Sequence, residues 1–236
     1  MTDAINVGLS AQRALSRALD ITANNIANMS TTGFRRERLA FGETFERLAT
    51  PGQGLSYADA PSSYTDMSQG ALKGTGAPLD VAIEGEGFLR VMTPEGERLT
   101  RDGRLALSPE GILKTVTGHD VLDGGGAPIA LPPGSAPAIA GDGTISVDGR
   151  AVGQLGLAMA AGGLAREADG LFRPLGAVEA AAEARVAQGM IEGSNVDAIT
   201  EITRLIEIQR GYERMSKLID SEHQREKGAI ERLTRT

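Results

Sequence analysis

The distribution of proline and glycine is the strongest constraint on how this 236-residue chain can fold. All 10 prolines lie between Pro51 and Pro174, and 24 of the 31 glycines lie between Gly52 and Gly176. Proline removes a backbone donor and glycine favours turns, so long helices can form only before and after this stretch. We therefore predict helical ends around an irregular, β-rich middle. This layout brings the termini together and favours a subunit that assembles through its terminal helices over an enzyme with a central cleft.

Composition argues against several classes of function. Aromatic residues make up only 3% of the chain and tryptophan is absent, so few side chains could stack on a flat ligand or a nucleobase. The net charge of −7 argues against nucleic acid as a partner. Because there is no cysteine, disulfides, thiolate metal sites and a cysteine nucleophile are ruled out. No apolar run approaches the ~20 residues of a membrane-spanning helix, so we expect no membrane insertion.

From the N-terminal sequence we expect no cleavable signal peptide. Residues 1–6 have neither the basic region nor the apolar region of a cleaved signal peptide. If the protein leaves the cytoplasm, we expect a dedicated secretion machine to recognise an uncleaved N-terminus.

Residues 1–33 are predicted to form a helix that ends at a glycine. Apolar side chains recur with alternating spacings of four and three, which is the pattern of a coiled-coil seam. The seam positions are Leu15, Leu19, Thr22, Ile26 and Met29. Gly33 is suited to the left-handed conformation that commonly follows the end of a helix.

Three asparagines near the end of this helix, Asn24, Asn25 and Asn28, have two interpretations. Asparagine is a poor helix former, so the group could be a frayed and solvated helix end. Alternatively, the three side chains lie in a packed interface and hydrogen-bond across it, where a buried amide would fix the register.

Residues 34–75 are predicted to be an extended connecting arm. Its apolar residues are Phe34, Leu39, Phe41, Phe45 and Leu48, and residues 50–54 interrupt it with proline and glycine. Three arginines at the start of the arm, Arg35, Arg36 and Arg38, surround one glutamate. In so acidic a chain, we expect these arginines to pair with carboxylates of a neighbouring subunit and not to bind an anion.

Residues 76–178 are predicted to form a β-rich domain. Short apolar runs such as residues 79–83 and 88–92 alternate with turns that contain glycine, as at residues 84–87 and 94–96. Strands this short and this frequent indicate an antiparallel sandwich or an open barrel.

Residues 179–236 are predicted to form a second long helix. The four-three spacing recurs at Ala198, Ile202, Leu205, Gln209, Tyr212, Ser216 and Ile219. Ser194 and Asn195 are candidate N-cap residues. Gly211 costs about 1 kcal/mol relative to alanine inside a helix, which suggests that another backbone passes close to it. The fold class is therefore α+β, with paired terminal helices and an antiparallel β-rich domain.

A search for chemistry finds no catalytic constellation. His119 and His223 each lack a nearby ligand partner in the sequence, so a metal site is not expected. Asp80, Glu84 and Glu86 alternate with apolar residues, which is typical of a solvated strand edge. We expect no catalytic residues, no metal and no cofactor.

Three groups of motifs resemble those of flagellar basal-body rod and hook proteins. Residues 19–28 (LDITANNIAN) and 30–34 (STTGF) resemble the N-terminal signature of that family. Residues 79–88 (LDVAIEGEGF) and 100–104 (TRDGR) resemble its β-domain signature, and residues 189–196 (GMIEGSNV) with 208–212 (IQRGY) resemble its C-terminal helix. The matches occur in the family's order and span nearly the whole chain.

The resemblance implies a structural subunit of the proximal rod, the drive shaft of the bacterial flagellar basal body. Residues 3–5, residues 190–196 and the short connector over residues 34–67 are closer to proximal than to distal rod members. It implies an inner layer of paired helices, an outer β domain, and polymerisation with copies of itself and with other rod proteins. It also implies export through the flagellar type III apparatus to a rod that spans the periplasm.

We expect the assembly interface to draw on both helices and on the junction after the first. The residues are Leu15, Leu19, Asn25, Ile26, Asn28, Gly33, Phe34, Ile202, Leu205, Tyr212 and Ile219. Two other functions stay open: a distal rod or hook-type subunit, and a secreted binding module on a helical stalk.

Overall fold

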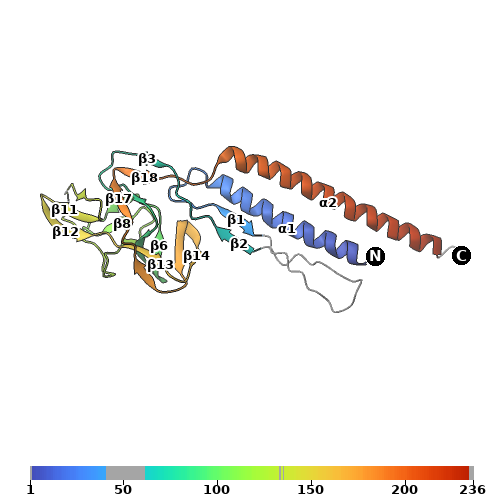
Figure 1. The fold of residues 1–236 in the computed structure, drawn as a ribbon, viewed down its shortest axis with the longest axis horizontal. Helices are drawn as coiled ribbons and strands as arrows, with labels where there is room; N and C mark the ends of the chain where they lie inside the picture. Colours follow the sequence, from blue (N-terminus) through green and yellow to red (C-terminus); the bar gives the residue numbers. More distant parts are fainter. Residues whose placement is uncertain (1, 41–61, 133, 135, 234–236) are drawn as a thin grey trace. The chain divides into compact units, whose positions relative to one another are not determined.

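The computed structural model describes residues 2–40, 62–132, 134 and 136–233 and has an α+β fold (Figure 1). It divides into two compact units. The helical unit comprises Met1–Ala27, Glu37–Asp66 and Asp197–Thr236, and the β unit comprises Asn28–Arg36 and Met67–Val196. The predictions for Phe41, Phe45, Leu48 and residues 50–54 lie outside the described residues.

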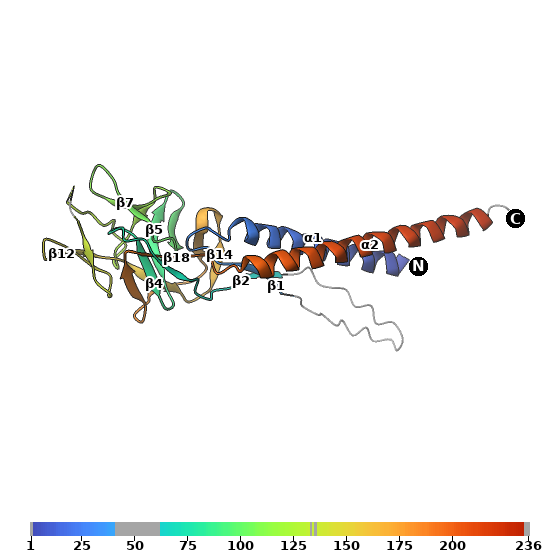
Figure 2. The same cartoon turned by 90° about the horizontal axis from the view of Figure 1, so that it is seen from above.

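The helical unit pairs the two ends of the chain. Helices α1 (Thr2–Ala27) and α2 (Ala198–Leu233) run antiparallel alongside each other (Figures 1 and 2). A Cβ atom added at Gly8 would lie 3.1 Å from Cγ1 of Ile219, and one added at Gly211 would lie 3.5 Å from Cδ2 of Leu15. The predicted pairing of terminal helices is confirmed. The neighbour of Gly211 is the side chain of Leu15, however, and not the backbone that we predicted.

The prediction that the second helix begins at Glu179 is wrong. Residues 178–192 instead form three strands, β16 (Val178–Ala180), β17 (Arg185–Gln188) and β18 (Met190–Glu192). Strand β17 pairs with β4 (Val81–Glu84), and β18 pairs with β3 (Leu72–Gly74). These ladders satisfy the backbone groups and bury Val186, so tertiary contacts override the helix propensity of this alanine-rich sequence.

Helix α2 is capped by Asp197, and not by the predicted Ser194 or Asn195. The Asp197 carbonyl accepts the Glu201 N–H at 3.0 Å, and its Oδ1 accepts the Thr200 N–H at 2.8 Å. Hydrogen bonds from the side chain and backbone of Thr200 hold the pKa of Asp197 below its ordinary value of 3.8. The ionised carboxylate also interacts favourably with the helix dipole.

The cap makes the stability of the helical unit depend on pH. Because the folded-state pKa is depressed, the stabilisation is present above the ordinary pKa and is lost as the pH falls through the folded-state value. We expect Asp197→Asn to lower the melting temperature of the helical unit at pH 7. That difference from the original protein should shrink below about pH 4, as circular dichroism melts at several pH values would show. A difference that stays constant over this range would contradict the assigned cap.

Part of the predicted arm folds into a hairpin in the helical unit. Strands β1 (Glu37–Ala40) and β2 (Ser62–Thr65) pair antiparallel, with Arg38 opposite Tyr64. Residues 34–36 belong to the β unit instead. The segment is therefore ordered at both of its described ends.

The β unit is antiparallel throughout its described strand pairs, as predicted. Its largest sheet follows the order β14–β15–β6–β5–β9–β8–β7, with β13 joining β5 to β16. The strands are β5 (Phe88–Thr93), β6 (Gly96–Thr100), β7 (Leu105–Leu107), β8 (Leu113–Thr115), β9 (Asp120–Val121), β13 (Leu157–Ala160), β14 (Leu164–Arg166) and β15 (Leu171–Pro174). A separate sheet contains β10 (Ala138–Ile139), β11 (Thr144–Val147) and β12 (Arg150–Gln154).

The hydrophobic core of the β unit consists mainly of aliphatic side chains from these strands. Val81, Leu89, Val91, Leu113 and Ile145 are fully or almost fully buried in it. A smaller cluster packs Phe88 against Phe172, with ring centroids 5.4 Å apart. The scarcity of aromatic residues therefore does not prevent the β unit from forming a continuous core.

Candidate assembly surfaces

One side of helix α2 presents three isoleucines to solvent. Ile199, Ile202 and Ile206 are 79%, 46% and 44% exposed. Spacings of three and four residues place them on the same side of the helix, which we call the isoleucine face. The contacts with α1 are made from a different side, through Gly211 and Ile219. Helix α2 thus has one apolar side that packs against α1 and a second apolar side whose three isoleucines are exposed to solvent.

The predicted seam residues on the two helices differ in how deeply they are buried. Leu15 and Ile219 lie at the contact between α1 and α2. The other predicted positions on the two helices that are half-buried are Leu19, Ile26, Leu205 and Tyr212. Among the predicted positions on α2, Ile202 is the one large apolar side chain that is exposed. Ile199 and Ile206 share the isoleucine face with Ile202 but are not among the predicted interface residues.

Asn25 is not part of a solvated helix end. It is only 1% exposed, its Nδ2 donates to the Glu37 carbonyl at 2.9 Å, and its Oδ1 accepts the Glu37 N–H at 2.9 Å. The carboxamide therefore makes the same two hydrogen bonds to Glu37 of β1 that a paired residue on a neighbouring strand would make. Asn28 is half-buried, and its Oδ1 accepts a hydrogen bond from Thr31 at 3.1 Å.

Gly33 and Phe34 are buried within the β unit. Gly33 has the left-handed conformation expected from the sequence, with φ +68°, and its N–H donates to the Glu192 carbonyl at 2.8 Å. Helix α1 ends at Ala27, however, so Gly33 is not the residue that stops the helix, contrary to our prediction. A Cβ atom at Gly33 would lie 2.5 Å from the Arg101 carbonyl carbon, so only glycine fits. The Arg166 guanidinium stacks on the Phe34 ring at 4.1 Å from its centroid.

Arg35 pairs within its own chain, which corrects the prediction of pairing between subunits. Its Nη2 lies 2.8 Å from Glu192 Oε1, and Arg101 Nη1 lies 3.1 Å from Glu192 Oε2. All three side chains are almost fully buried. Arg38 likewise pairs with Asp66 at 3.0 Å, in the helical unit. We call Arg35, Arg101 and Glu192 the buried charge cluster.

The buried charge cluster holds two positive charges against one negative charge. The pKa of Arg101 is lowered to about 10, chiefly by burial and also by the neighbouring Arg35, whereas Glu192 acts in the opposite direction. At neutral pH the Arg101 guanidinium therefore stays protonated, and the Glu192 carboxylate is the ion-pair partner of both buried arginines.

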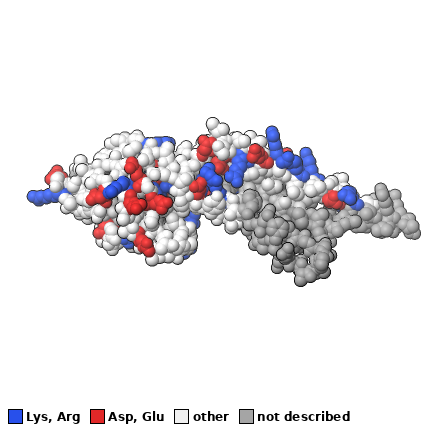
Figure 3. All heavy atoms as spheres, in the orientation of Figure 1, with Lys and Arg blue, Asp and Glu red and all other residues white. Residues whose placement is uncertain are grey.

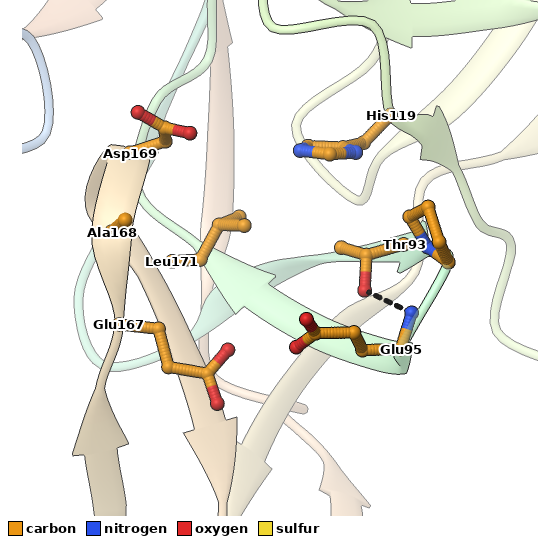
Figure 4. Close-up of a pocket in the computed structure, with 8 residues that line it drawn as sticks. Thr93, Glu95, His119, Glu167, Ala168, Asp169 and Leu171 are labelled. Atoms are coloured by element: carbon orange, nitrogen blue, oxygen red, sulfur yellow. Dashed lines mark hydrogen bonds between the residues drawn. The ribbon is translucent and has the colours of Figure 1, made fainter.

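The described part of the β unit also carries an open pocket of about 420 Å³ (Figure 4). His119 and Thr93 lie on one side and Glu167, Ala168 and Asp169 on the other, with Leu171 between them (Figure 4). Glu167 is paired with Arg98 at 2.6 Å and with Arg173 at 3.1 Å. These bonds, chiefly the one from Arg98, hold the pKa of Glu167 below its ordinary value. The sequence did not predict that His119 lines a pocket.

The remaining candidates for chemistry lie at the surface. Glu84, Glu86 and His223 are exposed and Asp80 is half-buried. Acidic and basic side chains lie next to one another on the face of the β unit shown in Figure 3. The described ion pairs of this unit include Arg90–Glu97. Among the described residues, no group of three His, Cys, Asp or Glu side chains could hold a metal ion. No helix in the described part of the chain is long and apolar enough to cross a membrane.

Comparison with known families gives matches along most of the chain. Residues 5–35 match the family model described as flagella basal body rod protein, and residues 82–149 match the flagellar hook protein FlgE/F/G D1 domain. Residues 187–231 match the flagellar basal body rod FlgEFG protein C-terminal model. A protein of Caulobacter vibrioides named flagellar basal-body rod protein FlgF is 41% identical, over 99% of this chain and 98% of the relative. The chain belongs to the family of flagellar basal-body rod proteins.

Two further relatives in this family indicate which member the chain resembles more. FlgF of Salmonella typhimurium is 37% identical over 99% of both chains. FlgG of Caulobacter vibrioides is 33% identical, over 94% of this chain and 95% of the relative. Of the two proteins from that one organism, FlgF is thus the more similar to this chain.

Each of the three family matches contributes one member of the buried charge cluster. Arg35 lies in the first match, Arg101 in the second and Glu192 in the third. The segments that identify the family in sequence therefore meet at one place in the β unit.

Proposed function

We propose that this protein is a structural subunit of the proximal rod of the bacterial flagellar basal body. It assembles by packing the isoleucine face of α2 against neighbouring rod subunits. The observation that carries this proposal is a solvent-exposed apolar helix face in a chain that FlgF relatives match over nearly its full length.

The energetics of the isoleucine face support assembly. Full burial of an isoleucine side chain contributes up to about 3 kcal/mol relative to exposure. Ile199 is nearly four-fifths exposed in the single chain, so most of this contribution is available only on association. Because each subunit of a polymer would make the contact, the gain would recur along the rod.

We further propose that the partners are copies of this chain and other rod proteins. Its location is the basal body, within the part of the rod that spans the periplasm. Export would occur through the flagellar type III apparatus without cleavage of a signal peptide. The role is structural, in line with the rod-protein names of the relatives.

A distal rod or hook-type role is the less favoured alternative, because the FlgG relative from Caulobacter vibrioides is less similar than FlgF from the same organism. The test is deletion of the gene in its own organism, followed by complementation with a tagged copy. We expect non-motile cells without the gene and tagged protein in purified basal bodies after complementation. Normal swimming of the deletion strain would contradict the proposal, and tagged protein found only in hooks would favour the alternative.

A further inference from the structure

The chain passes between the helical unit and the β unit four times. These connections follow Ala27, Arg36, Asp66 and Val196. Three segments of the β unit lie next to these connections: residues 28–36, 67–70 and 193–196. Two side chains, Asn195 and Glu192, each contact more than one of these segments.

Asn195 ties three of the connections together. Its Oδ1 accepts the Arg36 N–H at 2.7 Å, and its Nδ2 donates to the Ser68 carbonyl at 2.9 Å. Its own N–H donates to the Phe34 carbonyl at 3.3 Å. Asn195 itself lies directly before the connection to α2, so it links that connection to those at Arg36 and Asp66.

Glu192 joins the same segments from the buried side. Its Oε1 accepts the Gly70 N–H at 2.8 Å and pairs with Arg35, while its backbone carbonyl accepts the Gly33 N–H at 2.8 Å. Arg35 in turn donates to the Ser68 carbonyl through Nη1. Glu192 therefore contacts the segment after α1 and the segment that follows β2.

Arg101 fixes this arrangement to the core of the β unit. Its Nη1 donates to the Ile83 carbonyl at 3.0 Å and its Nη2 to the Gly85 carbonyl at 2.6 Å. Its guanidinium lies 5.1 Å from the centroid of the Phe88 ring. The contact between Arg101 and Glu192 thus joins the connecting segments to strand β4 and to the smaller hydrophobic cluster.

We infer that Arg35, Arg101, Glu192 and Asn195 form a connection clamp that holds all four chain connections against the β unit. Glu192 is its central positioning residue, because one carboxylate compensates two buried guanidiniums and accepts a backbone N–H. Loss of that carboxylate leaves two buried positive charges without a counter-charge. The connecting segments should then detach before the sheet of the β unit unfolds, because the sheet keeps its own ladders and core. This inference is independent of the proposed function.

The test is amide hydrogen exchange on the purified full-length protein and its Glu192→Gln variant. We expect exchange at the Gly33 and Gly70 amides to accelerate at least about tenfold. The backbone carbonyl that accepts the Gly33 N–H would shift, and the side chain that accepts the Gly70 N–H would lose its charge. Exchange at Val91 and Leu99 in the large sheet should not change. Glu167→Gln is the matched control, since Glu167 also pairs with two arginines but lies at the half-exposed surface and joins no connection. It should leave all four amides unchanged.

A second variant covers the case in which Glu192→Gln does not fold. Asn195→Ala removes the bonds to Arg36 and Ser68 without leaving a buried charge, and it should accelerate exchange at Arg36 with the sheet still protected. Unchanged exchange at Gly33, Gly70 and Arg36 in these variants would overturn the inference. So would a uniform loss of protection across the β unit in Asn195→Ala, since the contacts would then serve the core and not the connections.

Discussion

Ile202→Asp should abolish swimming while the secreted or purified subunit keeps the fold of its β unit. Ile202 is at the middle of the isoleucine face and is already 46% exposed in the single chain, so the substitution costs little before assembly. In a packed contact, an unpaired carboxylate would cost roughly 3 kcal/mol or more at each repeat of the rod. Swimming in soft agar and recovery of the chain in basal bodies measure the two parts of the prediction.

Val116→Asp provides the matched control for this experiment. Val116 is 54% exposed, but it belongs to the β unit and is not a residue of α2. The Val116→Asp substitution introduces the same charge at a similarly exposed apolar position, and cells that carry it should swim normally. If Ile202→Asp swims as well as Val116→Asp, the isoleucine face is not an assembly surface.

Asn25→Asp should destabilise the helical unit by roughly 3 kcal/mol at pH 7, because it buries a charge and turns a donor into an acceptor. The introduced carboxylate would face the Glu37 carbonyl, to which Asn25 Nδ2 now donates. At acid pH the carboxyl takes up a proton and can donate again, so stability should partly return. Chemical denaturation followed by circular dichroism at several pH values measures this effect.

The control for Asn25→Asp is the same type of change at an exposed position. Gln209→Glu replaces an amide with a carboxylate on the exposed surface of α2 and should change stability little. Asn25→Leu leaves both the Glu37 N–H and its carbonyl unpaired, so it should destabilise the unit at every pH. If Asn25→Asp behaves like Gln209→Glu, Asn25 does not hold β1 to α1.

The helices and the β class were predictable because the signals for them are local. Proline and glycine placement indicates where a helix cannot form, and Gly33 is a residue type that tolerates the positive φ it adopts, although α1 already ends at Ala27. The start of α2 was not predictable in this way. Residues 178–192 have helix-favouring alanines, and only pairing with strands distant in sequence makes them extended.

Sequence reasoning also could not tell which apolar side of α2 packs against α1. A helix with two apolar sides shows both in its periodicity, but the sequence does not say which side its own chain covers. Ile219 and Ile202 therefore looked equivalent, although Ile219 lies against Gly8 of α1 and Ile202 is 46% exposed. The buried charge cluster was missed because Arg35, Arg101 and Glu192 are far apart in sequence, and charged residues usually indicate a solvated surface. The available signal was that Arg101 and Glu192 lie inside two of the family motifs and that Arg35 directly follows a third.

The most direct test of assembly through the isoleucine face is cysteine labelling at position 202. The chain has no cysteine, so Ile202→Cys introduces a single thiol. A water-soluble maleimide should label this thiol readily in the purified single chain and again after basal bodies are dissolved in denaturant. In intact purified basal bodies, we predict that the same thiol is protected, because a neighbouring subunit covers it. Equal labelling in intact basal bodies and in the single chain would contradict assembly through this face.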